Sequence, residues 1–141
     1  MNTAAAYYES LFAPLVAEVG PLGEATATGV VGFSAGGPVS MVQAGVRGYM
    51  TCELSLYPEQ RLSAEGDHYE LLCRLALSAS QAQALLTGLG RLSMEATLGH
   101  GHTIDVTALK AAPGLSVITL RHYASVLVEE KRCSIYEVTS E

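Results

Sequence analysis

The hydrophobic pattern of this chain changes its period once, and this change limits the folds that it can adopt. Apolar side chains first occupy every second position, at Tyr69, Leu71, Cys73, Leu75 and Leu77. They then recur every three or four positions, at Ala82, Leu85, Leu86, Leu89, Leu92 and Ala96. The first period is typical of a half-buried strand and the second of an amphipathic helix. We therefore predict a strand over residues 69–77 and a helix near residues 79–98.

The start of that helix has the spacing of a capping box, in Ser78 with Gln81 or in Ser80 with Gln83. Residues 51–57 alternate as clearly as residues 69–77, so they also predict a strand. Weaker apolar runs predict the remaining strands, over residues 26–33, 38–46, 103–107, 115–123, 125–128 and 133–138. Residues 59–67 are polar and predict a loop.

Residues 3–19 predict an N-terminal helix, because their large apolar side chains share one helical face. Pro14 interrupts this pattern and predicts a kink or a division into two short helices. Strands in runs, with only two helices, are typical of an α+β domain. We expect a mostly antiparallel sheet with the N-terminal helix and the helix near residues 79–98 packed on it, in a single domain over residues 1–141.

Composition excludes several classes of function. The 141 residues are 49% hydrophobic and 16% charged, which excludes a disordered chain. The net charge is −6 and the basic residues are scattered, so we expect neither nucleic-acid binding nor attraction to an anionic membrane. Sparse charge favours contact with another protein or a homodimer. Three cysteines without CxxC spacing, and an N-terminus without a positive region, predict buried reduced thiols and a cytoplasmic protein.

Motifs for chemistry are weak in this sequence. Residues 32–36, GFSAG, fit the nucleophile motif GxSxG, but Gly37, Pro38 and a second predicted strand follow, which indicates a hairpin turn. His100 and His102 have HxH spacing, and a zinc site would need Asp105, His122 or Cys133 as well. We therefore predict no metal, no cofactor and no catalytic residue. A small metal-dependent or acid–base enzyme at the Gly99–Thr103 turn remains the alternative.

Candidate binding residues come from three places in the predicted fold. Glu53 and Tyr57 lie on the polar face of the strand predicted over residues 51–57. Glu65 and Asp67 lie in the polar loop, and His100 and His102 lie in the turn after the second helix. Tyrosine is favoured at protein interfaces because it offers contact area and a hydroxyl group. These six residues predict a surface that binds another protein.

Two segments and the order of elements resemble the suppressor-of-fused domain family. Residues 39–59, VSMVQAGVRGYMTCELSLYPE, are similar to its strand–turn–strand, with Glu53 and Pro58 in place. Residues 85–104, LLTGLGRLSMEATLGHGHTI, resemble its helix and Gly-His motif, at Gly101-His102-Thr103. The tail IYEVTSE resembles a late strand of the family but lacks its proline, which leaves the match at the C-terminal end in doubt.

The resemblance implies a binding role without catalysis. The eukaryotic member binds a transcription factor, and bacterial relatives include immunity proteins that neutralise toxins. This short chain looks more like the bacterial kind, and an acidic immunity protein would suit a toxin with a basic surface. The expected function is thus a non-enzymatic protein-binding module, of which a toxin-neutralising immunity protein is one form. A structural homodimer subunit is the remaining alternative.

Overall fold

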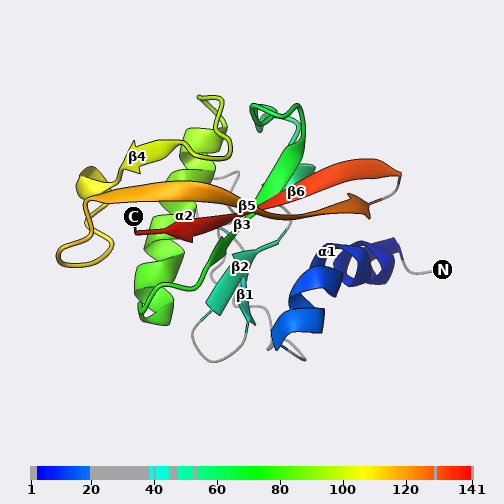
Figure 1. Cartoon of the computed structure of the whole chain (residues 1–141), viewed down its shortest axis with the longest axis horizontal. Coiled ribbons are helices and arrows are strands. Elements are labelled where there is room, and N and C mark those ends of the chain that lie inside the picture. The colour runs from blue at the N-terminus through cyan, green and yellow to red at the C-terminus, as the bar shows by residue number, and fades with distance from the viewer. Residues whose placement is uncertain are drawn as a thin grey trace.

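The computed structural model contains one six-stranded sheet with a helix on each face (Figure 1). It describes residues 3–19, 39, 41–44, 48–52, 54–128 and 130–140. The strand order is β1-β2-β3-β6-β5-β4. The strands are β1 (Met41–Ala44), β2 (Gly48–Thr51), β3 (His68–Cys73), β4 (Thr103–Asp105), β5 (Val117–Val128) and β6 (Lys131–Thr139). The helices are α1 (Thr3–Val19) and α2 (Ala79–Ser93), with short 3₁₀ turns η2 (Leu54–Leu56) and η3 (Thr107–Leu109).

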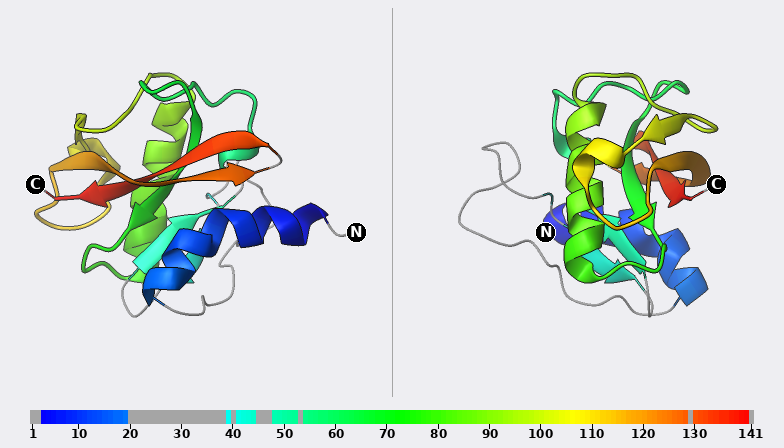
Figure 2. Two further views of the ribbon diagram at one scale, coloured as in Figure 1. Left: turned by 45° about the vertical axis from the view of Figure 1, so that its right-hand side comes forward. Right: turned by 90° about the vertical axis from the view of Figure 1, so that its left-hand side faces the viewer.

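The strand alternation divides the core between the two helices. Leu71 of β3 packs in a cluster with Leu85, Leu86 and Leu89 of α2. Its neighbour Leu72 packs in a second cluster with Leu11 and Leu15 of α1. Successive side chains of a strand point to opposite faces, so α1 and α2 cover opposite sides of the sheet, as Figure 2 shows. The α+β class expected from the sequence is confirmed.

The sheet is mixed, so the expected antiparallel arrangement holds for every pair but one. β3 and β6 run parallel, from the pair His68–Cys133 to the pair Cys73–Val138. Parallel neighbours need a long crossover, and α2 together with the β4–β5 hairpin forms it. Alternation within a strand reveals its two faces but not its neighbours, and therefore the sequence pattern did not reveal this pair.

The strand predicted over residues 51–57 is wrong. β2 ends at Thr51, and residues 54–56 form η2 instead. The buried carboxylate of Glu70 in β3 is the physical reason: its Oε2 accepts the backbone N–H of Ser55 at 2.7 Å. A side chain therefore takes the donor that a neighbouring strand would otherwise use.

The end of β3 beside this turn is also completed by side chains. Gln60 Nε2 donates to the carbonyl oxygen of Tyr69 at 2.9 Å, and Gln60 Oε1 accepts the Tyr69 N–H at 3.1 Å. The hydroxyl of Thr51 accepts the N–H of Leu71 at 2.8 Å. Among the described residues, β2 pairs with β3 only through Tyr49 and Met50, so these groups replace the missing strand. Buried backbone groups are thereby satisfied.

The helix predictions are largely confirmed. Ser78 caps α2, with both hydrogen bonds of the capping box to Gln81 present. The helix ends at Ser93 rather than near residue 98, because the chain turns there and Ser93 O accepts the N–H of Arg61. α1 continues through Pro14 as one helix, so the predicted division in two is not observed.

The C-terminal strands are longer than predicted. Residues 117–128 form the single strand β5, with an irregularity in its pairing between His122 and Ala124, where we expected two strands. β6 begins at Lys131 rather than at residue 133. Two predictions lie outside the described residues: the strand over residues 26–33 and the GFSAG motif. Of the strand predicted over residues 38–46, the structure shows β1, and most of the rest is not described.

An ion-pair network fastens α1 to the sheet. Arg74, which follows β3, donates two hydrogen bonds to Glu137 of β6, at 2.9 and 2.8 Å. The same guanidinium pairs with Glu18 of α1, whose other oxygen accepts the Tyr123 hydroxyl at 2.8 Å. These bonds lower the pKa of Glu18. Burial and the Glu18 carboxylate raise the pKa of Tyr123 to about 12.

The three cysteines are buried and free, as the sequence predicts. Neither helix in the described part of the chain has the length and apolar character needed to cross a bilayer.

Candidate functional site

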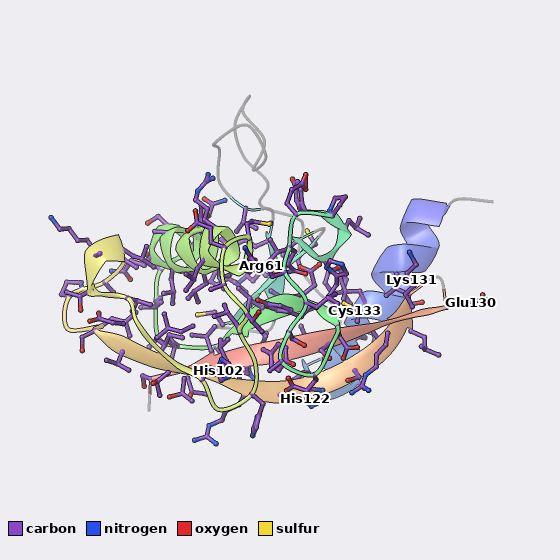
Figure 3. The ribbon with its side chains drawn as sticks, turned by 90° about the horizontal axis from the view of Figure 1, so that it is seen from above. Arg61, His102, His122, Glu130, Lys131 and Cys133 are labelled. Carbon is purple, nitrogen blue, oxygen red and sulfur yellow. The ribbon has the colours of Figure 1, made fainter. Side chains whose placement is uncertain are left out.

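A groove opens where the β5–β6 hairpin meets the turn that follows β2. We call it the hairpin groove. It encloses about 290 Å³ and is lined by Ser55, Leu56, Tyr57, Pro58, His68, Val128, Lys131, Arg132 and Cys133. Figure 3 labels Glu130, Lys131 and Cys133 in order along the start of β6. Three separate stretches of the chain therefore build the groove.

Glu70 holds one wall of the hairpin groove in place. Its carboxylate is fully buried beneath the turn, where it accepts the Thr51 hydroxyl at 2.6 Å and the Ser55 N–H at 2.7 Å. Hydrogen bonds to a buried charge each contribute about 1.5–3 kcal/mol. The position of Leu56 and Tyr57 thus depends on a carboxylate in the neighbouring strand.

The same wall presents apolar surface to solvent. Leu56 is 54% exposed although it lines the groove, and Pro58 beside it is exposed as well. Val128 closes the opposite side from β5. An exposed leucine alone has no special meaning, but one that lines a concavity with Tyr57 can receive an apolar side chain.

Two basic residues begin β6, and they differ in electrostatic environment. Arg132 Nε lies 3.1 Å from Asp67 Oδ2, so its charge is compensated. Lys131 is exposed and forms no ion pair with any residue in the described ranges. The lysine ammonium is therefore the positive charge that a ligand in the groove can use.

Cys133 lies in the floor of the groove but is not a nucleophile. Its side chain is nearly buried, and burial together with the carboxylate of Glu70 raises the pKa of the thiol to about 12. Nucleophilic attack needs the thiolate, which is scarce at neutral pH for such a group. Cys133 thus contributes neutral surface.

His68 completes the polar end of the groove. Its Nδ1 lies 3.0 Å from Gln60 Oε1, an oxygen that can only accept hydrogen bonds. The Gln60 amide is oriented by its two bonds to the Tyr69 backbone, so Nδ1 carries the proton. The other ring nitrogen, Nε2, is left for a ligand or solvent.

A polar network extends from the groove residue Arg132 across the hairpin. Ser134 donates to Asp67 Oδ2 at 2.9 Å, and Arg132 Nη2 donates to Ser125 Oγ at 3.4 Å. Ser125 Oγ also lies 2.8 Å from His122 Nε2. The network and Asp67 thus hold Arg132, whereas Lys131 has no ion-pair partner among the described residues.

The structure separates the six residues predicted to bind. Tyr57 lines the hairpin groove, and Asp67 contacts it indirectly through Arg132. Glu65 Oε1 accepts the N–H of His100 at 3.3 Å, so these two lie together. The side chain of His102 is exposed, and Glu53 lies outside the described residues.

The Gly99–Thr103 turn performs a structural task. His100 Nδ1 accepts the backbone N–H of His122 at 2.9 Å, and the carbonyl oxygen of His102 accepts the N–H of Leu120. His100 Nδ1 is thus engaged by the backbone, and Figure 3 shows His102 and His122 away from Cys133. Within the described ranges no three His, Cys, Asp or Glu side chains gather as a metal requires.

Sequence reasoning missed His68, Val128 and Lys131 as groove residues. In the sequence, Glu129 and Glu130 precede Lys131, so its charge looks locally neutralised. Strand alternation is the signal that could have found it, because side chains at 131 and 132 point to opposite faces of a strand and can therefore have different partners.

Comparison with known proteins identifies no family for this chain. No family model matches the chain, and no curated protein matches it. The resemblance to the suppressor-of-fused domain family therefore stays a prediction from the two segments quoted above.

Proposed function

We propose that this protein binds another protein and that the hairpin groove receives a segment of that partner. The partner segment carries an apolar side chain next to an acidic group. One observation carries this proposal: Lys131, which pairs with no carboxylate among the residues that the structure describes, lines the groove together with the apolar wall formed by Leu56, Tyr57 and Pro58. Complementary charge would orient the segment, and burial of the apolar side chain would supply affinity.

The proposed module works without catalysis. Its groove offers a lysine without an ion-pair partner in the described part of the chain, a neutral thiol and a histidine whose Nδ1 proton is engaged by Gln60. These groups suit recognition of an anion better than proton transfer, which needs an acid or base in reach of a reacting atom.

Toxin immunity remains one form of this proposal, suggested by the family resemblance. The net charge of −6 supports it, since an acidic protein can approach a basic toxin surface. The toxin would then also supply the acidic segment that enters the groove.

The test uses a matched pair of exposed apolar residues. The partner is first identified by cross-linking through a photoreactive residue at position 56, and its affinity for the purified protein is measured by calorimetry. Leu56→Ser, at a side chain that is 54% exposed, should weaken binding at least about tenfold. Val117→Ser, at a side chain that is 46% exposed at the far end of β5, should leave binding unchanged. Equal effects of the two substitutions, or an effect of Val117→Ser alone, would overturn the proposal.

A further inference from the structure

The register of the β5–β6 hairpin sets the distance between charge and apolar surface in the hairpin groove. Val128 and Lys131 are direct cross-strand partners, and both line the groove. The Cβ atoms of such a pair lie about 4.5–5.5 Å apart. A ligand that contacts Val128 therefore reaches the base of the Lys131 side chain without extending along the strand.

This arrangement favours an acidic group that lies close to the apolar side chain of the ligand. In an extended peptide, the next side chain on the same face is two residues away, or about 6.6–6.8 Å. An internal aspartate or glutamate on that face therefore starts farther along the strand from the apolar side chain. At a free carboxyl terminus, the carboxylate and the last side chain share one Cα atom.

The size of the groove points the same way. Its volume of about 290 Å³ is at the small end of ligand sites, which commonly span about 300–1,000 Å³. It accommodates one large residue, whereas a helix or a strand that continues past the groove needs space on both sides. A chain that ends in the groove needs only one exit.

The polar groups match a carboxylate. Lys131 supplies an ammonium with no ion-pair partner among the residues that the structure describes. Arg132 is already held by Asp67 and Ser125. One ammonium is sufficient to pair with a single carboxylate.

We infer that the hairpin groove binds the free carboxyl terminus of a partner chain whose last side chain is apolar. This inference rests on the proposed protein-binding function and specifies the part of the partner that is recognised. Lys131 pairs with the terminal carboxylate, while Leu56, Tyr57 and Val128 enclose the last side chain.

The experiment compares peptides that differ only in their acidic group. Backbone amide shifts of the ¹⁵N-labelled protein are followed while acetyl-Gly-Gly-Phe is added, with a free or an amidated carboxyl terminus. The free acid should shift the amides of Ser55, Leu56 and Cys133, and the amidated peptide should bind at least about tenfold more weakly. Amidated acetyl-Gly-Glu-Gly-Phe tests an internal carboxylate, and 3-phenylpropionate tests a small acid without a peptide chain.

Substitutions provide the second arm. Lys131→Gln should weaken the free-acid peptide about tenfold, whereas Lys110→Gln, which removes a cation after η3, should not change it. The amide spectrum of each variant shows whether it is folded. Equal binding of acid and amide, tighter binding of the internal glutamate or of phenylpropionate, or no shift at millimolar peptide would overturn the inference. If Leu56→Ser still weakens the cross-linked partner in that case, the proposed function stands and only the terminal carboxylate is wrong.

Discussion

The buried carboxylate of Glu70 accepts the backbone N–H of Ser55 at 2.7 Å and thereby fixes the wall of the hairpin groove. Replacing Glu70 by glutamine keeps the size of the side chain but turns an amide N–H₂ toward one of two donors. We expect Glu70→Gln to lower the free energy of unfolding by about 2–3 kcal/mol in urea denaturation. Glu95→Gln, at an exposed position after α2, should change it by less than about 0.5 kcal/mol. Similar stabilities for the two variants would show that the Glu70 bonds do not hold the turn.

The Glu18 carboxylate should make stability depend on pH in the acid range. Its pKa in the folded protein lies below the ordinary value of 4.5, because it accepts the Tyr123 hydroxyl and pairs with Arg74. The contribution of Glu18 is therefore fully present above pH 4.5 and is lost as the pH falls through the folded-state pKa. The stability difference between the wild type and Glu18→Gln, measured in urea, should shrink toward zero on acidification. A difference that is constant with pH would contradict this assignment.

Tyr123 should show the opposite dependence. Its pKa is raised from 10.0 to about 12 by burial and by the Glu18 carboxylate. A raised pKa stabilises the fold below pH 10.0, and this contribution is lost as the pH rises through about 12. Tyr123→Phe removes both the hydrogen bond to Glu18 and the titration. Its stability deficit relative to the wild type should thus diminish in strongly alkaline urea, and a deficit that grows there would contradict the prediction.

Cys133 should resist thiol reagents in the folded protein. A pKa of about 12 in place of 9.0 reduces its thiolate fraction near neutral pH about a thousandfold. Iodoacetamide followed by peptide mapping should therefore leave Cys133 unmodified in buffer and modify it in concentrated urea. Rapid modification of Cys133 in the native protein would mean that the groove floor is open.

Gly88 allows η3 to pack closely on α2. A Cβ atom at this position would lie 2.5 Å from Leu109 Cδ2, so an alanine would displace the Leu109 side chain. Helix propensity favours alanine over glycine by about 1 kcal/mol, which offsets part of that cost. We expect Gly88→Ala alone to change stability little. In a Leu109→Ala background the same substitution should stabilise by about 1 kcal/mol. Equal effects in both backgrounds, measured by thermal unfolding, would contradict the contact.

Local features of this chain were readable from its sequence, whereas distant contacts were not. The capping box at Ser78 and the alternation that begins at Tyr69 involve residues within a few positions. The capping box is confirmed, and the predicted strand exists as β3, but it ends at Cys73, so its predicted end at residue 77 is wrong. Residues 51–57 alternate equally well, yet a carboxylate in another strand ends β2 there. An alternating apolar pattern is therefore compatible with a strand and also with a short 3₁₀ turn. The turn forms here because the carboxylate of Glu70 accepts the backbone N–H of Ser55.

The candidate site shows the same division. Tyr57 was found because aromatic side chains on polar faces indicate contact surfaces. Lys131 was missed because neighbouring glutamates mask its charge in the sequence, whereas its pairing with Val128 in space defines the site. His68 gave no signal of its own, because its place depends on the parallel pairing of β3 with β6.

The parallel pairing of β3 with β6 also sets an order of events during synthesis of the protein. β3 lies between β2 and β6, and β6 is the last of the described strands along the chain. During translation, the edge of β3 that pairs with β6 has no hydrogen-bond partner until β6 has been synthesised. Non-local pairing of this kind is slow and leaves apolar surface exposed in the meantime. Nascent chains of this protein are therefore expected to need a chaperone more than a fold built from successive hairpins would.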